Sequence, residues 1–173
     1  MTIQERLAKI RFFKVTPDLS GLKKSEQEAL AHCVQAARIT TDIYLEQVAH
    51  GNTEIYESLK RRSDQEGIDL LRYFNLHGTP WDAYDHDKPF VPGVGEKPKF
   101  GSFYPADLTK EEWDAWLAAH PEDREQFESN YTAIKRRGGR LIAVPYSEEY
   151  SVQLVEAAKQ LKAGQSASFT HSE

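Results

Sequence analysis

The residues best suited to hydrolytic chemistry in this 173-residue chain are its histidines. Zinc peptidases place two imidazoles one helical turn apart, with a glutamate between them as base, so that both rings face one metal ion. The six histidines are His32, His50, His77, His86, His120 and His171. No two of them have that spacing, so we predict that this chain holds no catalytic residue and no metal ligand.

A second candidate is the run Asp82-Ala83-Tyr84-Asp85-His86-Asp87, which gathers three carboxylates and one imidazole. Such a set could hold a hard cation or transfer a proton. The glycine and final glutamate of a calcium loop are missing at the required spacing. We favour a solvated turn in which the aspartates cap local N–H groups, and keep a metal-dependent hydrolase built on this cluster as a remote alternative.

The remaining reactive or charged residues favour structural roles. Lys135–Arg140 is the most basic stretch and could bind phosphate, but the chain is acidic overall, so we interpret it as a hairpin tip that protects an edge strand. Cys33 is the only cysteine, and its place on an apolar helix stripe predicts a buried, unreactive thiol. Trp81, Trp113 and Trp116 could stack on a ligand, although their spacing favours the core.

Composition narrows the class of protein. The net charge is −5, which gives no general attraction for nucleic acid or an anionic membrane. A single cysteine excludes an intrachain disulfide, and the N-terminus lacks the order of a signal peptide, so we expect a cytoplasmic protein. The length fits one domain, which we place at 1–164, followed by a flexible polar tail at 165–173.

Helix signals dominate the first half of the chain. Ser25 and Glu28 form a capping box that predicts the start of a long helix, and Gly51 suits its end. The expected inward stripe of this helix is Leu30, Cys33, Val34, Ala37, Thr41, Tyr44, Leu45 and Val48. A second helix, capped by Asn52 or Thr53, and a third one ending at Gly78 should follow.

The stretch 79–105 contains five prolines and three glycines, yet many aromatic residues, which indicates an ordered, packed loop. Thr109 and Glu112 form another capping box, with Leu108 and Trp113 as a hydrophobic staple, and this helix should stop before Pro121.

Two strand-like stretches, 131–137 and 140–144, flank Gly138-Gly139 and predict a β-hairpin. Ser147 should cap a last helix that buries Val155, Ala158 and Leu161 and ends at Gly164, whereas 10–16 reads as a short strand or extended arm. The predicted fold is α+β: a mostly helical single domain with one β-hairpin and a long ordered Pro/Gly-rich loop.

Several short sequence segments together resemble the N-terminal lobe of the dipeptidyl peptidase III-like zinc peptidases, in their bacterial and plant branch. These segments are 16–20, 81–82, 89–94, 97–98, 103–112 and 144–150. The most specific are Phe103-Tyr104-Pro105 and the Pro-Tyr-Ser-Glu-Glu-Tyr stretch at 145–150. The family phrase usually has asparagine before Phe-Tyr-Pro, where this chain has Ser102. Its zinc motif resembles His-Glu-x-x-Gly-His and belongs to the second lobe, and nothing in this sequence matches it.

The resemblance implies a two-lobed metallopeptidase that removes dipeptides from oligopeptides, with zinc as the cofactor of the parent family and none in this chain. We therefore expect a non-catalytic domain, either a fragment of the enzyme or a stand-alone relative, that forms one wall of a peptide cleft. Phe103, Tyr104 and Asp107 are the expected contacts to a peptide or to a catalytic lobe. The alternative is a helical interaction or regulatory module with no small-molecule site.

Overall fold

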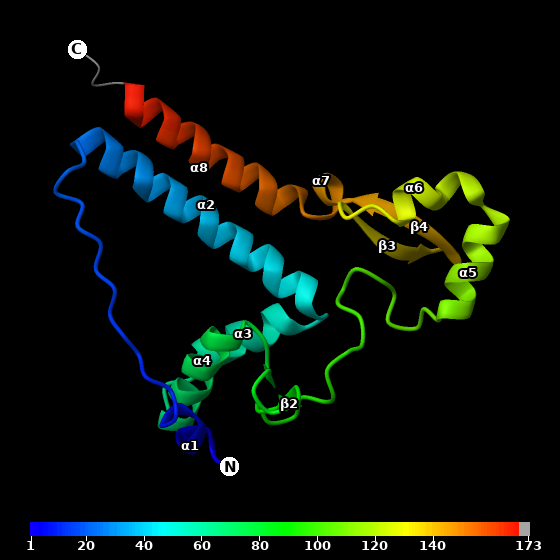
Figure 1. The fold of residues 1–173 in the computed structure, drawn as a ribbon, viewed down its shortest axis with the longest axis horizontal. Coiled ribbons are helices and arrows are strands. Elements are labelled where there is room, and N and C mark those ends of the chain that lie inside the picture. The colour runs from blue at the N-terminus through cyan, green and yellow to red at the C-terminus, as the bar shows by residue number, and fades with distance from the viewer. Residues whose placement is uncertain (170–173) are drawn as a thin grey trace.

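Two long antiparallel helices, α2 (Lys24–Val48) and α8 (Ser151–Phe169), lie side by side in the structure, a computed structural model that describes residues 1–169 (Figure 1). Their facing surfaces carry small side chains, including the buried Ala36 and Ala157. Gly164 lies so close to the partner helix that an added Cβ would be 3.1 Å from the Cβ of His32. The two helices are thus packed closely along a narrow seam.

The seam also carries polar contacts. His32 Nδ1 lies 2.9 Å from Gln160 Oε1, and the side-chain amide of Gln153 donates to Glu46 at 2.7 Å. Because these bonds join residues more than 100 positions apart, they fix the register of the helix pair.

The second group of elements lies at the C-terminal end of α2 (Figure 1). It contains α1 (Ile3–Leu7), α3 (Asn52–Lys60), α4 (Gln65–His77) and the short hairpin of β1 (Trp81–Asp82) and β2 (Lys88–Pro89). Its core is formed by Leu45, Leu59, Leu70 and Phe74. Gly78 ends α4 in the left-handed conformation, at φ +64°, as the sequence predicts.

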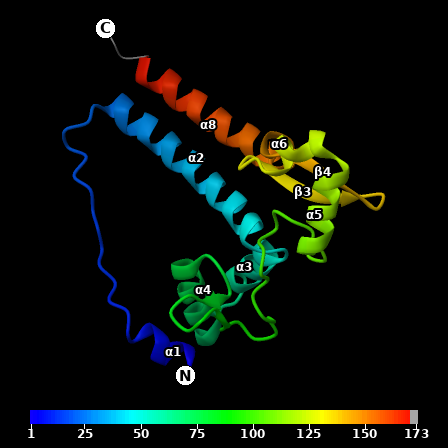
Figure 2. The same cartoon turned by 45° about the vertical axis from the view of Figure 1, so that its right-hand side comes forward.

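The third group surrounds the second hairpin, β3 (Thr132–Arg137) and β4 (Arg140–Pro145) (Figure 2). Gly138 and Gly139 have φ of +57° and +78°, the conformation that a tight two-residue turn requires. The core of this group joins the hairpin to α5 (Lys110–Ala119) and α6 (Arg124–Phe127) through Leu117, Phe127, Ile134 and Leu141. The one-turn helix α7 (Tyr146–Glu149) leads from β4 into α8.

The α+β class is confirmed, since the structure is mostly helical with small antiparallel hairpins. The β1–β2 hairpin was not predicted, because its strands are only two residues long and one of them contains a proline. None of the helices in residues 1–169 is both long and apolar enough to cross a membrane.

The long helix begins differently from the prediction. Lys23 occupies the N-cap position, and its backbone N–H donates to the Glu26 carboxylate at 2.7 Å. Ser25 therefore does not cap the helix; it is buried in the first turn. Thr109 does cap α5, accepting from the backbone N–H of Glu112 at 3.1 Å, but the Glu112 side chain binds Arg136 instead of reaching back.

The predicted inward stripes of α2 and α8 are largely wrong. Leu30, Val34 and Tyr44 are exposed, and so is the Cys33 thiol, which we predicted to be buried. A different face, one that includes Ala36 and Ile43, is buried instead. The helices meet through small and polar residues, while the larger apolar residues point elsewhere.

The same holds for α8, where the expected core residues Val155 and Leu161 are exposed. Ser147 lies inside α7 and caps nothing. Gly164 does not end the helix, which continues to Phe169, because this glycine serves close packing against α2. The rest of the predicted tail, 170–173, with His171, lies outside the described residues.

The N-terminus contains a helix that we did not predict. In α1, Thr2 accepts from the backbone N–H of Glu5, whose carboxylate accepts from the N–H of Thr2 at 2.8 Å. The stretch that follows, 11–23, is an extended arm without strand pairing, and all its residues are exposed.

Candidate functional site

The loop before α5 carries the sequence-predicted site residues and is held in place from two sides. The N–H of Ser102 donates to the Gln47 carbonyl at 2.9 Å, and the carbonyl of Phe103 accepts from the N–H of Ile134 at 2.7 Å. Gly101 is required here, because a Cβ would lie 2.4 Å from the Gln47 carbonyl oxygen. The loop is therefore fixed between the end of α2 and strand β3.

Tyr104 contributes to an aromatic hollow on the surface. Its ring lies edge-on to Trp113, with centroids 5.6 Å apart, and to Phe100 at 6.0 Å. The hollow has a volume of about 460 Å³ and is lined by Phe100, Tyr104, Leu108, Thr109, Lys110 and Trp113. Its walls are mainly apolar, with one lysine among the lining residues, so it suits an apolar or aromatic side chain.

The other two predicted site residues do not join this hollow. The Phe103 ring packs against Tyr146, with centroids 6.2 Å apart. Asp107 is exposed and pairs with Arg136 at 3.1 Å, beside the bidentate pair of Arg136 with Glu112 at 2.7 and 3.0 Å. The structure thus gives Phe103 and Asp107 packing and pairing partners within the chain.

Phe100 is a residue of the hollow that sequence reasoning missed. It is 58% exposed, so its aromatic face is open to solvent or a ligand. The signal was present in the sequence: an aromatic residue in a proline- and glycine-rich loop, four positions before Tyr104. We assigned it to packing in general, because nothing in the pattern says which aromatic residue of such a loop turns outward.

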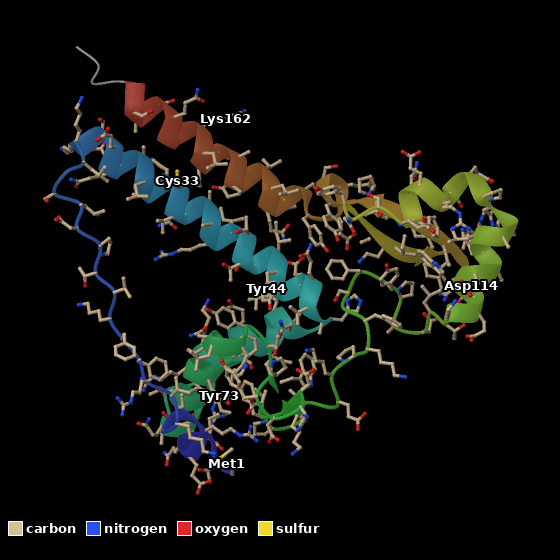
Figure 3. The ribbon with its side chains drawn as sticks, viewed as in Figure 1. Met1, Cys33, Tyr44, Tyr73, Asp114 and Lys162 are labelled. Carbon is tan, nitrogen blue, oxygen red and sulfur yellow. The ribbon has the colours of Figure 1, made fainter. Side chains whose placement is uncertain are left out.

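The Asp82–Asp87 cluster is organised around one buried carboxylate. Asp82, only 2% exposed, accepts from the guanidinium of Arg6 in α1, from the hydroxyl of Tyr73 at 2.8 Å and from the N–H of Tyr84 at 2.8 Å. Burial opposes ionisation of Asp82, but these hydrogen bonds outweigh it and hold the pKa of its carboxyl below its ordinary value of 3.8. Asp82 therefore anchors α1 and the turn between β1 and β2, beside Tyr73 of α4, which is labelled in Figure 3.

His77 lies at the edge of this network. Its Nε2 is 3.9 Å from Asp82 Oδ1 and makes no hydrogen bond, while its ring packs against Tyr73, Tyr84 and Phe90. Burial lowers the pKa of this imidazole, and the nearby charge of Arg6 lowers it further, against the attraction of Asp82. The ring is therefore neutral at pH 7.

A metal site does not form from these side chains. Within residues 1–169 no three histidine, cysteine, aspartate or glutamate side chains are placed to hold an ion together. Asp82 already has three donors, and Asp85 and Asp87 pair with Lys88 and Lys97 at 2.9 and 3.0 Å. These residues do not fit the zinc ion of a peptidase. The predicted solvated turn describes Asp85 and Asp87, whereas Asp82 is buried.

The basic hairpin stretch is also engaged within the chain, since Lys135 pairs with Glu149 and Arg136 with two carboxylates. Trp81 is buried and donates to the Gly95 carbonyl at 2.8 Å, which confirms its core role. Trp113 and Trp116 pack partly buried against Phe127.

Comparison with solved structures relates the chain to a known enzyme. Dipeptidyl peptidase III from Caldithrix abyssi matches 97% of this chain at a TM-score of 0.89 and 39% sequence identity. The enzyme from Corallococcus sp. strain EGB matches 95% at a TM-score of 0.86 and 35% identity. This chain is dipeptidyl peptidase III-like over almost its whole length. It covers only 32% and 31% of those two chains, and it lacks the zinc motif.

The chain is also 26% identical to Nudix hydrolase 3 of Arabidopsis thaliana over an alignment that is 216 residues long, gaps included. The alignment covers 95% of this chain and 28% of that protein. No protein-family model matches the chain. The chain thus spans about a third of the length of each protein that it resembles.

Proposed function

We propose that this chain is a non-catalytic lobe-like unit of a dipeptidyl peptidase III-like protein, corresponding to the N-terminal, substrate-side lobe, and that it forms one wall of a peptide-binding cleft. The match of 97% of its residues to about a third of the Caldithrix abyssi enzyme carries this proposal. Its histidine spacing supports the non-catalytic part, because no helical turn of the sequence offers two imidazoles to one ion.

The aromatic hollow is the part of the surface best suited to peptide contact. Phe100, Tyr104 and Trp113 supply flat apolar walls. Trp113 lies in α5, and the loop that carries Phe100 and Tyr104 is fixed at both sides, so little ordering entropy is lost on binding. Phe103 and Asp107 then act indirectly, through the Tyr146 contact and the Arg136 pair, by keeping the loop in place.

The peptide part of the proposal is tested by calorimetry of the full chain with short oligopeptides that carry bulky apolar side chains. Phe100→Ala should weaken binding, because it opens one wall of the hollow, and Tyr104→Ala should weaken it further. Phe13→Ala is the matched control: this phenylalanine is 82% exposed on the extended arm and should not affect binding. Equal affinity of all three variants and the unmodified chain would exclude the hollow as a peptide site.

The non-catalytic part is tested with a dipeptidyl-arylamide substrate and zinc analysis of the purified chain. We expect no turnover and no stoichiometric zinc. Turnover that a chelator abolishes and added zinc restores would overturn this part, since it would require a metal centre that the described side chains do not form.

The second candidate function is the helical interaction module. The exposed apolar residues of α2 and α8 favour this interaction module, because monomeric proteins rarely leave a continuous apolar face exposed to water. A tight homodimer that binds no peptide would support this alternative.

A further inference from the structure

One side of the α2–α8 pair is mostly uncharged, and its residues are defined by their position next to the seam. Glu26, which follows the buried Ser25, is a charged residue at one end of this side. Leu30 and Cys33 follow, by one position, Ala29 and His32, which contact Gly164 of α8, and Ala37 and Tyr44 follow the buried Ala36 and Ile43. Leu154 and Leu161 likewise follow Gln153 and Gln160 of α8. In an antiparallel pair, residues one step beyond the seam on each helix lie on the same side of the layer. We call these six residues the apolar face.

The opposite side of the same pair carries more charged and polar residues, although the exposed Val152 also lies there. The residues one step before the seam on α2 include Glu28, Gln35 and Asp42, and those on α8 include Glu156 and Lys159. Charged side chains are therefore more frequent on one side of the layer, and large apolar side chains are more frequent on the other. This asymmetry is typical of a helix layer that water covers on one side and protein on the other.

The apolar face is exposed in the structure although four of its six side chains are large. Leu161 is 53% exposed, Tyr44 48% and Leu30 39%. From Leu30 to Tyr44 the face extends about 21 Å along α2, and it is two helices wide. Figure 3 labels Cys33 and Tyr44 along this helix.

We propose that the apolar face is the docking surface for the polypeptide that makes up the other two thirds of a dipeptidyl peptidase III-like protein. This rests on the proposed function. The occupant should be an uncharged, apolar protein surface, since a charged group placed against this face would be buried without a partner. The length of the relatives supports this choice: the same fold, at a TM-score of 0.89, forms only 32% of the Caldithrix abyssi chain.

The close-packed seam makes the docking surface rigid before it binds. Gly164 packs against Ala29 and His32. The His32–Gln160 and Gln153–Glu46 hydrogen bonds fix the register of the two helices. The two rows of apolar side chains are therefore presented at a constant spacing. A preformed surface of this kind loses little conformational entropy on docking.

The test uses a chimera in which this chain replaces the matching third of the full-length Caldithrix abyssi enzyme. Ala37→Glu places a charge in the middle of the apolar face, and Ala31→Glu places the same charge on an exposed alanine of the same helix, beyond the apolar face. Both substitutions are compared in the chimera and in the isolated chain. The reactivity of the Cys33 thiol measures directly whether the apolar face is covered. Its reaction with a thiol reagent is obtained by subtracting the signal of the Cys33→Ser variant.

We expect Ala37→Glu to lower the melting temperature of the chimera by several degrees, and Ala31→Glu to have no such effect. Neither should destabilise the isolated chain, where both positions face water. Cys33 should react at least about tenfold more slowly in the chimera than in the isolated chain. The two substitutions at the aligned positions of the unmodified Caldithrix abyssi enzyme give a second measurement that does not depend on the chimera folding.

Equal effects of Ala37→Glu and Ala31→Glu in the full-length proteins, or unchanged Cys33 reactivity, would overturn the proposal. So would an isolated chain that is a dimer and that Ala37→Glu dissociates, because the occupant would then be a second copy. These readouts need no peptide, so they separate docking from the peptide cleft. If Cys33 is protected in the chimera and Tyr104→Ala has no effect on peptide turnover by the chimera, the docking surface is supported and the peptide site is excluded.

Discussion

Removing the charge of Asp82 is the most informative perturbation of the fold. In Asp82→Asn the side chain keeps its shape, but one carboxylate oxygen becomes an NH₂ group. In the unmodified chain, the two carboxylate oxygens of Asp82 accept from Arg6, Tyr73 and the N–H of Tyr84. Whichever way the amide turns, its NH₂ group faces a donor.

The cost can be worked from these contacts. An unsatisfied buried donor costs about 1–3 kcal/mol. Breaking a buried ion pair by removing one partner costs about 3–5 kcal/mol. Arg6 retains a pair with Asp85 at 3.3 Å and is slightly exposed, so the lower end applies and we expect a loss of about 3 kcal/mol.

The assay is urea unfolding followed by circular dichroism at pH 7. With an m-value of about 2 kcal/mol/M, the midpoint should fall by about 1.5 M. The control is Asp85→Asn in the same turn: this carboxylate is more exposed and pairs mainly with an exposed lysine, so the midpoint should change far less. Similar small shifts for both variants would refute the view that Asp82 anchors α1 to the turn.

The network also predicts a dependence on pH. The pKa of Asp82 is lowered in the folded chain, so its contribution is complete above its ordinary value of 3.8 and is lost as the pH falls through the lower, folded pKa. The unmodified chain should thus lose stability below pH 4 more steeply than Asp82→Asn. Parallel acid-unfolding curves for the two proteins would contradict this.

Three further predictions concern other parts of the fold. Because burial lowers the pKa of His77, the unfolded chain binds a proton more readily, so stability should fall as the pH drops from 7 to 5, and His77→Gln should flatten that slope in urea titrations. Gly164→Leu should cost about 1–3 kcal/mol by overpacking the seam, whereas Gly21→Ala, with nothing within 4 Å, should leave thermal stability nearly unchanged. Thr109→Ala should cost about 1 kcal/mol in urea unfolding through loss of the α5 cap, and no change would show that the staple alone sets the start of the helix.

Local signals predicted the elements well wherever the chemistry is local. The Thr109 cap, the Gly78 helix end and the Gly138-Gly139 turn all occur as expected, because each depends on the backbone geometry of a few neighbouring residues. The α1 helix was missed although Thr2 and Glu5 carry the same kind of capping signal.

Side-chain environment was predicted less well, because it depends on partners far away in the sequence. Asp82 looked like one of three equivalent aspartates, yet it is the one that binds Arg6, 76 positions earlier, together with Tyr73. Tyr104 was rightly placed in a packed loop, but no local pattern shows that Phe100 stands open beside it. The site residues remain predictions that the binding experiments address.

The error made for α2 carries the strongest argument about the whole molecule. A stripe of apolar residues at three- and four-residue steps predicts a buried helix face, and the sequence of α2 contains such a stripe. Among residues 1–169, other segments cover the C-terminal part of this stripe, where Leu45 packs with Leu59, Leu70 and Phe74. The part from Leu30 to Ala37 continues with the same periodicity, and these same described residues leave its side chains exposed. Since one helix face carries one continuous pattern, the same pressure to exclude water acts along its whole length, and a body beyond these residues is the simplest way to satisfy it.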